Sequence, residues 1–401
     1  MNLRMMTIDS IKIDGQFGNK QLINMIKVGI TGQAGFIGSH LYNYLYLKED
    51  LELVKFERSY FTSIRSLENF VEKCDVIVHL SAINRHSDQQ IIYDTNVNLV
   101  QSLIKACENT QSKPHIIFSS STQENKENLY GKSKQVGRKL LEEWASKYNS
   151  KTTGLVIPNV FGPFGKPNYN SVVATFCHKI THNEKPEILN DRIVRLIYVH
   201  ELIDDIYSII KEQKIGKVEL AHTSEVKVSE LLSILNEFKA QYMEQGRIPD
   251  INSPFRLALF NTFICYLPKD HYPFNFTKHT DNRGSFVEIV RANTSGQFSF
   301  STTVPGITRG NHFHTRKAER FAVIKGSARI DWRKVDSDVV TSFTLHGDDP
   351  SFVDMPIWHT HSITNIGNEE LITLFWINEP YNPDDPDTYF VNVYLEKEVT
   401  A

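Results

Sequence analysis

The sequence predicts an α/β protein in two parts: a doubly wound parallel sheet followed by an all-β barrel. Over the first 240 residues, short apolar runs alternate with longer amphipathic stretches, which is typical of strand–helix–strand units in a parallel sheet. A glycine-rich segment follows the first apolar run directly. After about residue 268 the long amphipathic stretches end, and short alternating runs separated by turn residues indicate a barrel or sandwich.

Length and composition limit the function classes. The chain has 401 residues with 47 acidic and 44 basic side chains, so we expect two or three domains and a net charge of −3. This charge excludes a basic nucleic-acid-coating protein and gives no reason to expect a membrane partner. No apolar run reaches the roughly 18 residues of a membrane span. The four cysteines form no Cys-x-x-Cys pair, which favours the reduced cytoplasm.

The predicted domain boundaries follow changes in pattern. Residues 1–24 carry several charges without the apolar core of a secretory signal, and we treat them as an N-terminal extension. Residues 25–245 form the α/β domain, residues 246–268 the linker and residues 269–401 the β domain. Gly246 to Pro254 is rich in turn residues, and Ser253–Leu267 is a possible linking helix.

The α/β domain is expected to consist of strands joined by helices. The predicted strands are Val28–Thr31, Leu53–Phe56, Val76–Leu80, Ile116–Ser119 and Leu155–Ile157. The predicted helices are Phe36–Leu47, Ile64–Glu72, Thr95–Glu108, Tyr130–Tyr148 and a last one at Val228–Gln241, capped by Ser229 or a neighbour. In the β domain we expect strands at Phe286–Val290, Gln297–Thr303, Arg320–Ile324, Ala328–Trp332 and Leu371–Ile377.

The glycine-rich segment runs from Thr31 to Gly38 and lies between a strand and a helix. Its glycines permit a tight turn, close approach of a pyrophosphate and close packing of helix on strand. The free N–H groups of the helix start suit phosphate oxygens. We therefore predict a dinucleotide site formed by Gly32, Gly35, Phe36, Ile37 and Gly38.

Two charged residues at the end of the second predicted strand bear on the choice of cofactor. Glu57 could hold a ribose 2′-hydroxyl, whereas Arg58 could hold a 2′-phosphate. Two solvated charges at a strand end remain the alternative. We favour NADP because a cation is present for its extra phosphate.

The run Ser119–Ser121 and the pair Tyr130 and Lys134 form a candidate catalytic group. The spacing i, i+4 places the phenol and the ammonium on one helix face. A phenol has a pKa near 10, and a nearby ammonium favours the phenolate. We predict that Tyr130 donates a proton, Lys134 tunes it and Ser121 orients a carbonyl oxygen. An exposed Tyr and Lys on a surface helix are the alternative.

These motifs resemble the extended short-chain dehydrogenase/reductase family, which acts on nucleotide sugars and has a Rossmann-like domain. The matching segments are the glycine run, His79–Ala82, Asp94–Asn96, Ser119–Ser121, Tyr130 with Lys134, Pro158–Pro163 and Arg195 ahead of Tyr198–Glu201. The resemblance implies cofactor contacts from Leu80, Ser81 and Ala82, and from Lys134 to a ribose. It also implies substrate contacts from Asn159 and Arg195. The family usually has an acidic pair where His200 and Glu201 stand.

Four side chains of metal-ligand type stand out in the β domain. A strand places His312 and His314 on one face, and Glu319 and a third imidazole, His361, follow at spacings that allow convergence. Such a set suits Zn, Fe, Mn or Ni, and zinc is our first choice. A group of satisfied polar residues in a barrel is the alternative.

This spacing resembles the two sequence boxes of the cupin superfamily. The second box departs from the pattern, because Trp358 stands where a glycine is usual and His359 precedes the expected ligand His361. On a strand the two histidines share one face, so their roles could be shared or exchanged, and we favour His361. Asp281 to Glu288 is similar to the opening of sugar-nucleotide cupins, which implies substrate contacts from Asp281, Arg283 and Glu288; a charged β-turn is the alternative.

Residues 25–401 together resemble the bifunctional CapF-type enzymes of capsular polysaccharide synthesis, in the UDP-N-acetyl-L-fucosamine pathway. The resemblance implies a UDP-2-acetamido-2,6-dideoxy-4-ketohexose as substrate. The cupin would epimerise C3, and the reductase would then reduce the C4 ketone with NADPH to the L-talose sugar. A C4 ketone acidifies the C3 proton, and a metal could act as a Lewis acid on the enolate. A metal-bound His312 could not serve as base, so we expect another group to do so.

Two alternatives remain open. The chain could be an isomerase or dehydratase that recycles bound NAD, with Glu57 on the ribose. The cupin could instead be a binding or dimerisation module with a structural metal. A homodimer is the default expectation for the assembly.

Overall fold

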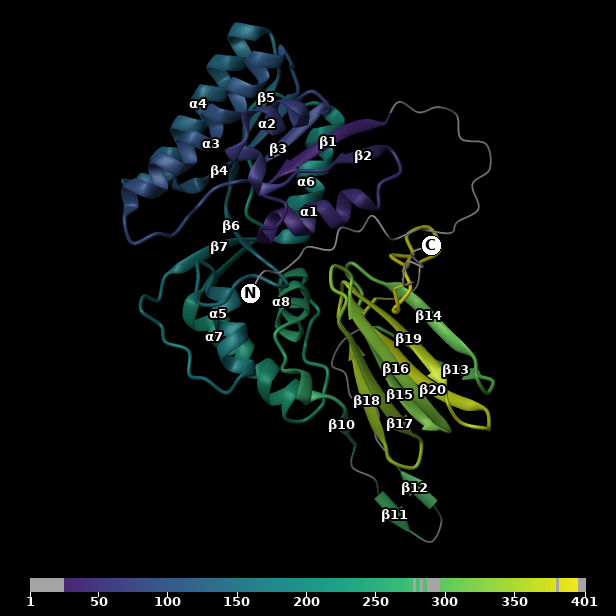
Figure 1. Ribbon diagram of the computed structural model, residues 1–401. Coiled ribbons are helices and arrows are strands. Elements are labelled where there is room, and N and C mark those ends of the chain that lie inside the picture. The colour runs from purple at the N-terminus through teal and green to yellow at the C-terminus, as the bar shows by residue number, and fades with distance from the viewer. Residues whose placement is uncertain (1–24, 277–278, 282–283, 287–295, 380–381, 396–401) are drawn as a thin grey trace. The chain divides into compact units, whose positions relative to one another are not determined.

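The computed structural model describes residues 25–276, 279–281, 284–286, 296–379 and 382–395 (Figure 1). The predicted extension 1–24 lies outside these residues, as do Arg283, Glu288 and most of the predicted strand Phe286–Val290. The described chain forms two compact units. One contains residues 25–176 and 186–232, and the other contains residues 177–185 and those from Ser233 onward. The sequence predicts the boundary within 246–268, and contacts divide the chain earlier, at Ser233.

The first unit is built on a six-stranded parallel sheet, as predicted (Figure 1). Its strands, in spatial order, are β2 (Leu51–Val54), β1 (Ile26–Thr31), β3 (Val76–His79), β4 (His115–Ser121), β5 (Thr152–Ile157) and β8 (Gly216–Glu219). The strands on the two sides of β1 are reached in opposite directions, so the crevice at the carboxyl end of β1 and β3 is a topological switch point. Parallel sheets of this kind bind ligands there.

Helices cover both faces of this sheet, because the strands are apolar on both sides. The helices α1 (Phe36–Tyr46) and α6 (Val199–Glu212) pack on one face through residues such as Leu41, Leu45 and Ile206. On the other face lie α2 (Ile64–Val71), α3 (Gln89–Thr110) and α4 (Leu129–Tyr148). The two apolar layers hold the carboxyl ends of the strands in a fixed order.

Several element boundaries differ from the predicted ones, and so does one helix cap. The strand β2 ends at Val54, two residues before the predicted end. The helix α3 begins at Gln89, six residues before the predicted start, because the Asp88 carboxylate caps it by accepting from the N–H of Gln90 at 2.8 Å. At the start of α7 (Val228–Phe238) the capping acceptor is Asp191, which accepts from the Ser229 N–H at 2.8 Å, and not Ser229 itself.

A small sheet completes the first unit beside the carboxyl end of the large one. Its strands are β6 (Asn159–Phe161), β7 (Ile193–Tyr198) and β9 (Ser224–Lys227), with β6 parallel and β9 antiparallel to β7. The helix α5 (Val172–Thr181) lies between β6 and β7 in the chain.

The second unit joins a helical segment to the predicted all-β region. After α7 come a π-helical turn (Lys239–Met243) and α8 (Pro254–Ile264), which is capped by Ser253 and falls within the predicted linking helix. One antiparallel sheet has the order β10 (Phe274–Asn275), β18 (Ser351–Met355), β15 (Glu319–Lys325), β20 (Leu371–Ile377) and β13 (Gln297–Thr303). The other has the order β17 (Val340–His346), β16 (Ser327–Lys334), β19 (His359–Asn365), β14 (Thr308–Phe313) and β21 (Tyr389–Phe390).

The two sheets share one apolar core. Ala322 and Val353 come from the first sheet, whereas Ile330, Leu345 and Ile363 come from the second. A separate hairpin pairs β11 (His279–Asp281) with β12 (Gly284–Phe286). The prediction of a parallel sheet followed by an all-β barrel is confirmed. Among the described residues, none of the helices combines the length and apolar character that a membrane crossing requires.

Two candidate active sites

The glycine loop lies at the switch point of the parallel sheet. Gly32 has φ of +77°, and a Cβ added there would lie 2.8 Å from the backbone nitrogen of Ser81 in the loop after β3. A Cβ on Gly38 would lie 2.1 Å from the carbonyl oxygen of Gly32. Both positions therefore require glycine, the first for its backbone conformation and the second for the close approach of α1 to the loop.

The start of α1 fits a dinucleotide pyrophosphate. Gly35 occupies the N-cap position, and no described side chain caps the helix there. The first-turn N–H groups at Phe36 and Ile37 are therefore not capped by a side chain, and they carry the positive end of the helix dipole. The residues present match the requirements of a nicotinamide dinucleotide at this edge.

The predicted ribose-recognition residues lie in the loop after β2. Because β2 ends at Val54, Glu57 and Arg58 are not at the strand end itself. Glu57 forms an exposed ion pair with Lys55 at 3.0 Å, and Arg58 begins a 3-10 helix (Arg58–Thr62). Both charged groups are exposed on the β2 side of the glycine loop.

A chain of hydrogen bonds joins the loop after β3 to the helix that carries Tyr130. The side chain of Asn96 bonds to both backbone groups of Ile83, at 2.8 and 2.9 Å. The same amide donates to the hydroxyl of Ser133 at 3.1 Å, and Ser133 donates to the carbonyl of Tyr130 at 2.7 Å. The position of Tyr130 is thus fixed relative to the predicted cofactor residues Leu80, Ser81 and Ala82, which directly precede Ile83.

The structure brings the predicted catalytic residues to the same edge. The Nζ of Lys134 donates to the carbonyl of Ser119 at 2.8 Å and lies 5.9 Å from the ring centre of Tyr130. Ser121 ends β4, and its hydroxyl accepts from the N–H of Gln123 at 3.2 Å. The end of β4 and the first turns of α4 therefore present a hydroxyl, a phenol and an ammonium beside the glycine loop.

Burial changes the titration of this group. Burial, with a smaller effect of Tyr169, raises the pKa of Tyr130 to about 12. Burial lowers the pKa of Lys134 to about 8, against the opposing effect of the Glu124 carboxylate. The pKa of the phenol therefore shifts upward, opposite to the lowering predicted from Lys134, because desolvation of the phenolate dominates. Tyr130 is held protonated, which is the state that a proton donor needs.

A buried histidine beside this group had no assigned role in the sequence. His79 ends β3, and its Nδ1 lies 2.8 Å from the hydroxyl of Thr31 at the start of the glycine loop. Burial, with a smaller effect of Lys134, lowers its pKa to about 3, so it is neutral. The feature of the sequence that could have pointed to His79 is its position at the end of a predicted buried strand.

The predicted substrate residues lie on the small sheet. The side-chain amide of Asn159 on β6 donates to the carbonyl of Arg195 on β7 at 3.3 Å. The Arg195 guanidinium is exposed and donates to the Glu225 carboxylate on β9 at 2.7 Å. His222 contacts the same carboxylate at 2.8 Å. The sequence did not reveal this acidic partner, because β9 lies 30 residues further along the chain.

The departure from the family pattern at His200 and Glu201 has a local explanation. Glu201 accepts from the N–H of Tyr198 at 3.0 Å and from the hydroxyl of Thr223 at 2.6 Å. The carboxylate therefore caps the start of α6 and joins it to the segment before β9. His200 lies 3.6 Å from the Asp204 carboxylate, one helical turn away.

The second site is a group of four side chains in the barrel. The ligand atoms of His312, His314, Glu319 and His361 all lie within 4.8 Å of one another. They come from β14, from the residue directly after it, from the start of β15 and from β19. Nε2 of His361 and Nε2 of His314 lie 3.0 and 3.3 Å from Oε2 of Glu319. Among the described residues, these three buried atoms have no hydrogen bond to a group outside the cluster.

Each imidazole is oriented by a backbone group. Nδ1 of His314 lies 2.6 Å from the carbonyl oxygen of Asp387, and Nδ1 of His361 lies 3.2 Å from that of His359. The ring of His312 hydrogen-bonds the backbone of Gly310. Since a carbonyl only accepts, Nδ1 of His314 and His361 carries a proton, and Nε2 of each ring points at Glu319 and is the atom that would hold a metal. This is the pattern of metal-ligating histidines.

The charges of the cluster also suit a cation. Burial alone would raise the pKa of Glu319, but the imidazoles of His314 and His361 hold it well below its usual range. Burial, with the two other imidazoles, lowers the pKa of His312 to about 4. The Glu319 carboxylate raises the pKa of His314 against the opposing effect of burial. Three imidazoles and one carboxylate form a donor set that fits a divalent transition metal.

The two departures in the second cupin box are resolved by geometry. His359 is held by the carbonyl of Ile357 at 3.0 Å and packs on Trp332, and the four-residue cluster contains His361 in its place. Trp358 has φ of +59°, the left-handed conformation that explains why glycine is usual there. Of the predicted sugar-contacting residues, Arg283 and Glu288 lie outside the described residues, and Asp281 ends the short strand β11.

Comparisons with known proteins cover both units. Residues 28–219 match the NAD dependent epimerase/dehydratase family, and residues 279–389 match the polysaccharide biosynthesis C-terminal domain. A relative from Pseudomonas aeruginosa, UDP-2-acetamido-2,6-beta-L-arabino-hexul-4-ose reductase, is 32% identical over 92% of this chain and 99% of its own length. The crystal structure of the capsular polysaccharide assembling protein CapF from Staphylococcus aureus is 32% identical, with a TM-score of 0.60 over 92% of this chain and 100% of that one.

The chain belongs to the CapF family. The predicted resemblance to this family is thereby confirmed. A further relative, the spore coat polysaccharide biosynthesis protein SpsL of Bacillus subtilis, is 28% identical over 27% of this chain and 80% of its own length. Membership in the CapF family implies a nicotinamide cofactor, in agreement with the glycine loop and the α1 start.

Proposed function

We propose that this CapF-family protein is a bifunctional enzyme of capsule or O-antigen polysaccharide synthesis. Its substrate is UDP-2-acetamido-2,6-dideoxy-4-ketohexose. The cupin domain epimerises C3, and the reductase domain then reduces the C4 ketone with NADPH to UDP-2-acetamido-2,6-dideoxy-L-talose, a precursor of L-fucosamine. The observation that carries this proposal is the end-to-end match to a relative named as a reductase of a 4-keto UDP-sugar.

Three side chains act in the reduction. A nicotinamide held at the glycine loop would supply the hydride for C4. The Ser121 hydroxyl donates to the ketone oxygen and orients it, and Tyr130 transfers its phenolic proton to that oxygen as it gains negative charge. Lys134 stabilises the phenolate left behind and binds the cofactor ribose. The high pKa of Tyr130, about 12, keeps the proton on the phenol until the oxygen can accept it.

The choice of NADPH rests on charge at the ribose. Arg58 is exposed in the loop after β2, and a cation after the second strand is the feature that favours a 2′-phosphate. Glu57 is already paired with Lys55, which reduces its repulsion of that phosphate.

Substrate binding is assigned to the small sheet. Arg195 is a cation for the UDP diphosphate, and Asn159 beside it offers an amide. Because Arg195 is paired with Glu225 at 2.7 Å, binding of a diphosphate has to compete with that carboxylate. Arg283 is proposed to contact the sugar in the cupin domain.

The four-residue cluster is proposed as a divalent metal site, with zinc as the expected ion. His312, His314, Glu319 and His361 would hold it. A bound ion would supply Lewis acidity that makes the C3 proton of a neighbouring 4-ketone more acidic. Because all three imidazoles are ligands, the base is assigned to another group.

We further propose a cytoplasmic homodimer with domains at residues 25–245 and 269–401.

The test is the stoichiometry of cofactor oxidation. With the purified 4-keto UDP-sugar, we expect one NADPH to be oxidised for each sugar reduced. The oxidation is measured as the loss of NADPH absorbance. The second candidate, an epimerase or dehydratase with recycled NAD, is favoured by the name of the matching family. It predicts conversion of the sugar without net NADPH oxidation, and that result would overturn our proposal.

A further inference from the structure

A segment near the C-terminus lies along β14, the strand that carries the proposed metal ligand His312 and directly precedes His314. We call residues 385–393 the strap. Its strand β21 pairs with β14, so that Phe390 lies opposite His312 and Tyr389 opposite Phe313. The Val391 N–H then donates to the carbonyl of Asn311 at 2.8 Å. The strap therefore adds an edge strand, β21, to the sheet that carries His312 and His361.

One strap residue, Asp387, hydrogen-bonds the chain directly after His314, and we call this set of bonds the clasp. Its carboxylate accepts from the hydroxyl of Thr315 at 2.6 Å, from the Thr315 N–H at 3.1 Å and from the Arg316 N–H at 3.0 Å. Asp387 is 2% exposed, so these bonds are shielded from water. Its φ of +44° is left-handed, a conformation that Asp and Asn tolerate better than other non-glycine residues.

The same residue also contacts the ligand itself. The carbonyl oxygen of Asp387 accepts from Nδ1 of His314 at 2.6 Å. The side chain thus fixes the backbone on one side of His314, while the main chain fixes the tautomer and the tilt of its ring. Nothing else among the described contacts of His314 Nδ1 has this role.

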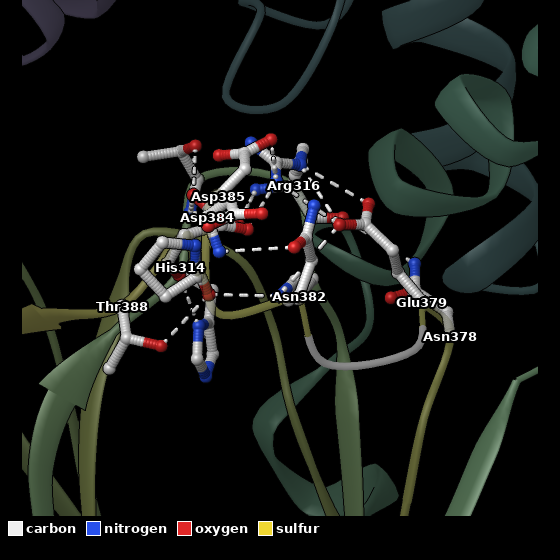
Figure 2. Close-up of polar contacts among 12 residues, drawn as sticks. His314, Arg316, Asn378, Glu379, Asn382, Asp384, Asp385 and Thr388 are labelled. Carbon is white, nitrogen blue, oxygen red and sulfur yellow. Dashed lines mark hydrogen bonds and ion pairs between the residues drawn. The ribbon is translucent and has the colours of Figure 1, made fainter.

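Two cations fasten the strap around this clasp. In Figure 2, Arg316 lies between acidic residues, and it donates to Glu379 at 3.1 Å and to Asp385 at 2.7 Å. The buried ammonium of Lys317 donates to the carbonyl of Pro386 at 2.8 Å. The two residues before Asp387, Asp385 and Pro386, are therefore held by Arg316 and Lys317. The Asp387 carboxylate cannot move without breaking several hydrogen bonds.

We propose that Asp387 is a positioning residue for the metal, and that the strap is part of the metal site. It acts through His314, whose Nε2 it directs into the cluster, and makes no contact with the metal itself. This inference rests on the metal site proposed above. Groups that orient metal-bound histidines typically contribute about 10-fold to 100-fold in affinity.

The experiment measures the affinity of the full-length protein for Zn²⁺ and Co²⁺ by chelator competition, with the Co²⁺ absorption spectrum recorded. Asp387→Ala removes every side-chain acceptor, and we expect an affinity loss of about 10-fold to 100-fold with an altered Co²⁺ spectrum. Asp387→Asn keeps one acceptor oxygen and tolerates the left-handed backbone, so its loss is smaller. Glu369→Gln is the control, because Glu369 lies outside the strap and forms an exposed ion pair with Lys325 at 3.0 Å; its metal affinity should stay within about 2-fold of the wild type.

The outcomes separate this inference from the metal site as such. If the wild-type protein binds neither ion, the metal proposal fails. If the wild type binds metal and both Asp387 variants match it, the positioning role is overturned. If Asp387→Ala does not fold, Asp387→Asn and Thr315→Val decide, since each weakens the clasp without removing it. Thermal unfolding in chelator is compared for all variants, and an equal affinity loss in Glu369→Gln would also contradict the proposal.

Discussion

At the scale of single residues, the protonation state of Tyr130 is the feature on which the reduction depends. Replacing Tyr130 by Phe removes the proton donor and keeps the ring that packs at the start of α4. We expect kcat for NADPH oxidation to fall by about 10²-fold to 10⁴-fold, which is typical of a lost general acid. The binding constant for NADPH, measured by fluorescence, should change little. Turnover at the wild-type rate would remove Tyr130 from the mechanism.

Lys134 predicts a pH dependence. Its pKa is lowered to about 8, so it loses its charge as the pH rises through 8, whereas Tyr130, with a pKa of about 12, stays protonated. We therefore expect kcat at saturating NADPH to decline above about pH 8. In Lys134→Arg the guanidinium remains charged, so this decline should disappear even if the overall rate is lower. A decline that persists near pH 8 in the variant would assign it to another group.

Residue roles differ in how far the sequence could reveal them. Tyr130, Lys134 and the four cluster residues are close in sequence or follow a recognisable spacing. Asp387 is 73 residues from His314 and contacts it through a backbone carbonyl, which leaves no mark in a side-chain pattern. Glu225 is also distant in sequence from its partner, because only the pairing of β7 with β9 brings it to Arg195.

At the scale of elements, the junction of β1 and α1 sets the geometry of the cofactor site. In Gly38→Ala the new Cβ would lie 2.1 Å from the Gly32 carbonyl oxygen, so the helix and the loop have to separate. We expect a destabilisation of about 1–3 kcal/mol in urea unfolding. The dissociation constant for NADPH should rise about tenfold, equal to about 1.4 kcal/mol.

Gly35→Ala is the graded control for that prediction. Its Cβ would lie 3.2 Å from the same carbonyl oxygen, a contact that a small shift relieves. The losses in stability and in NADPH affinity should be smaller than in Gly38→Ala. If the order of the two variants were reversed, close packing of α1 on the loop would not be the limiting constraint.

Element boundaries were predicted less well than element types. The apolar periodicity located every strand of the parallel sheet except β8, because burial on both faces leaves an apolar run. The early start of α3 was missed because Asp88 caps a polar first turn that carries no apolar signal. In the barrel, β14 has an irregular register between Gly310 and His312, so His314 falls beyond the strand that was predicted to contain both ligands.

At the scale of the whole molecule, the two sites belong to separate units and should respond independently to metal removal. After dialysis against a chelator, we expect exchange of the C3 proton to fall by at least about 100-fold, because Lewis-acid assistance contributes several kcal/mol. Reduction of sugar that has already been epimerised should stay within about 2-fold. Re-addition of Zn²⁺ should restore the exchange, and equal loss of both activities would contradict separate sites.

The overall organisation could be predicted because each half has its own periodicity and its own motif. The residues at which the chain divides could not, because α8 and the segment Cys177–Lys185 join the second unit through tertiary contacts. One such contact is the hydroxyl of Thr181, which donates to the carbonyl of Tyr266 at 2.8 Å.

The most direct measurement is the position of deuterium in the product. The protein is incubated with the 4-keto UDP-sugar and NADPH in D₂O, and the product is analysed by NMR. The account predicts an L-talose product that carries solvent deuterium at C3 and hydrogen from NADPH at C4. A reduced sugar with hydrogen at C3 and unchanged configuration there would show that the barrel does not epimerise the substrate, and would contradict the account.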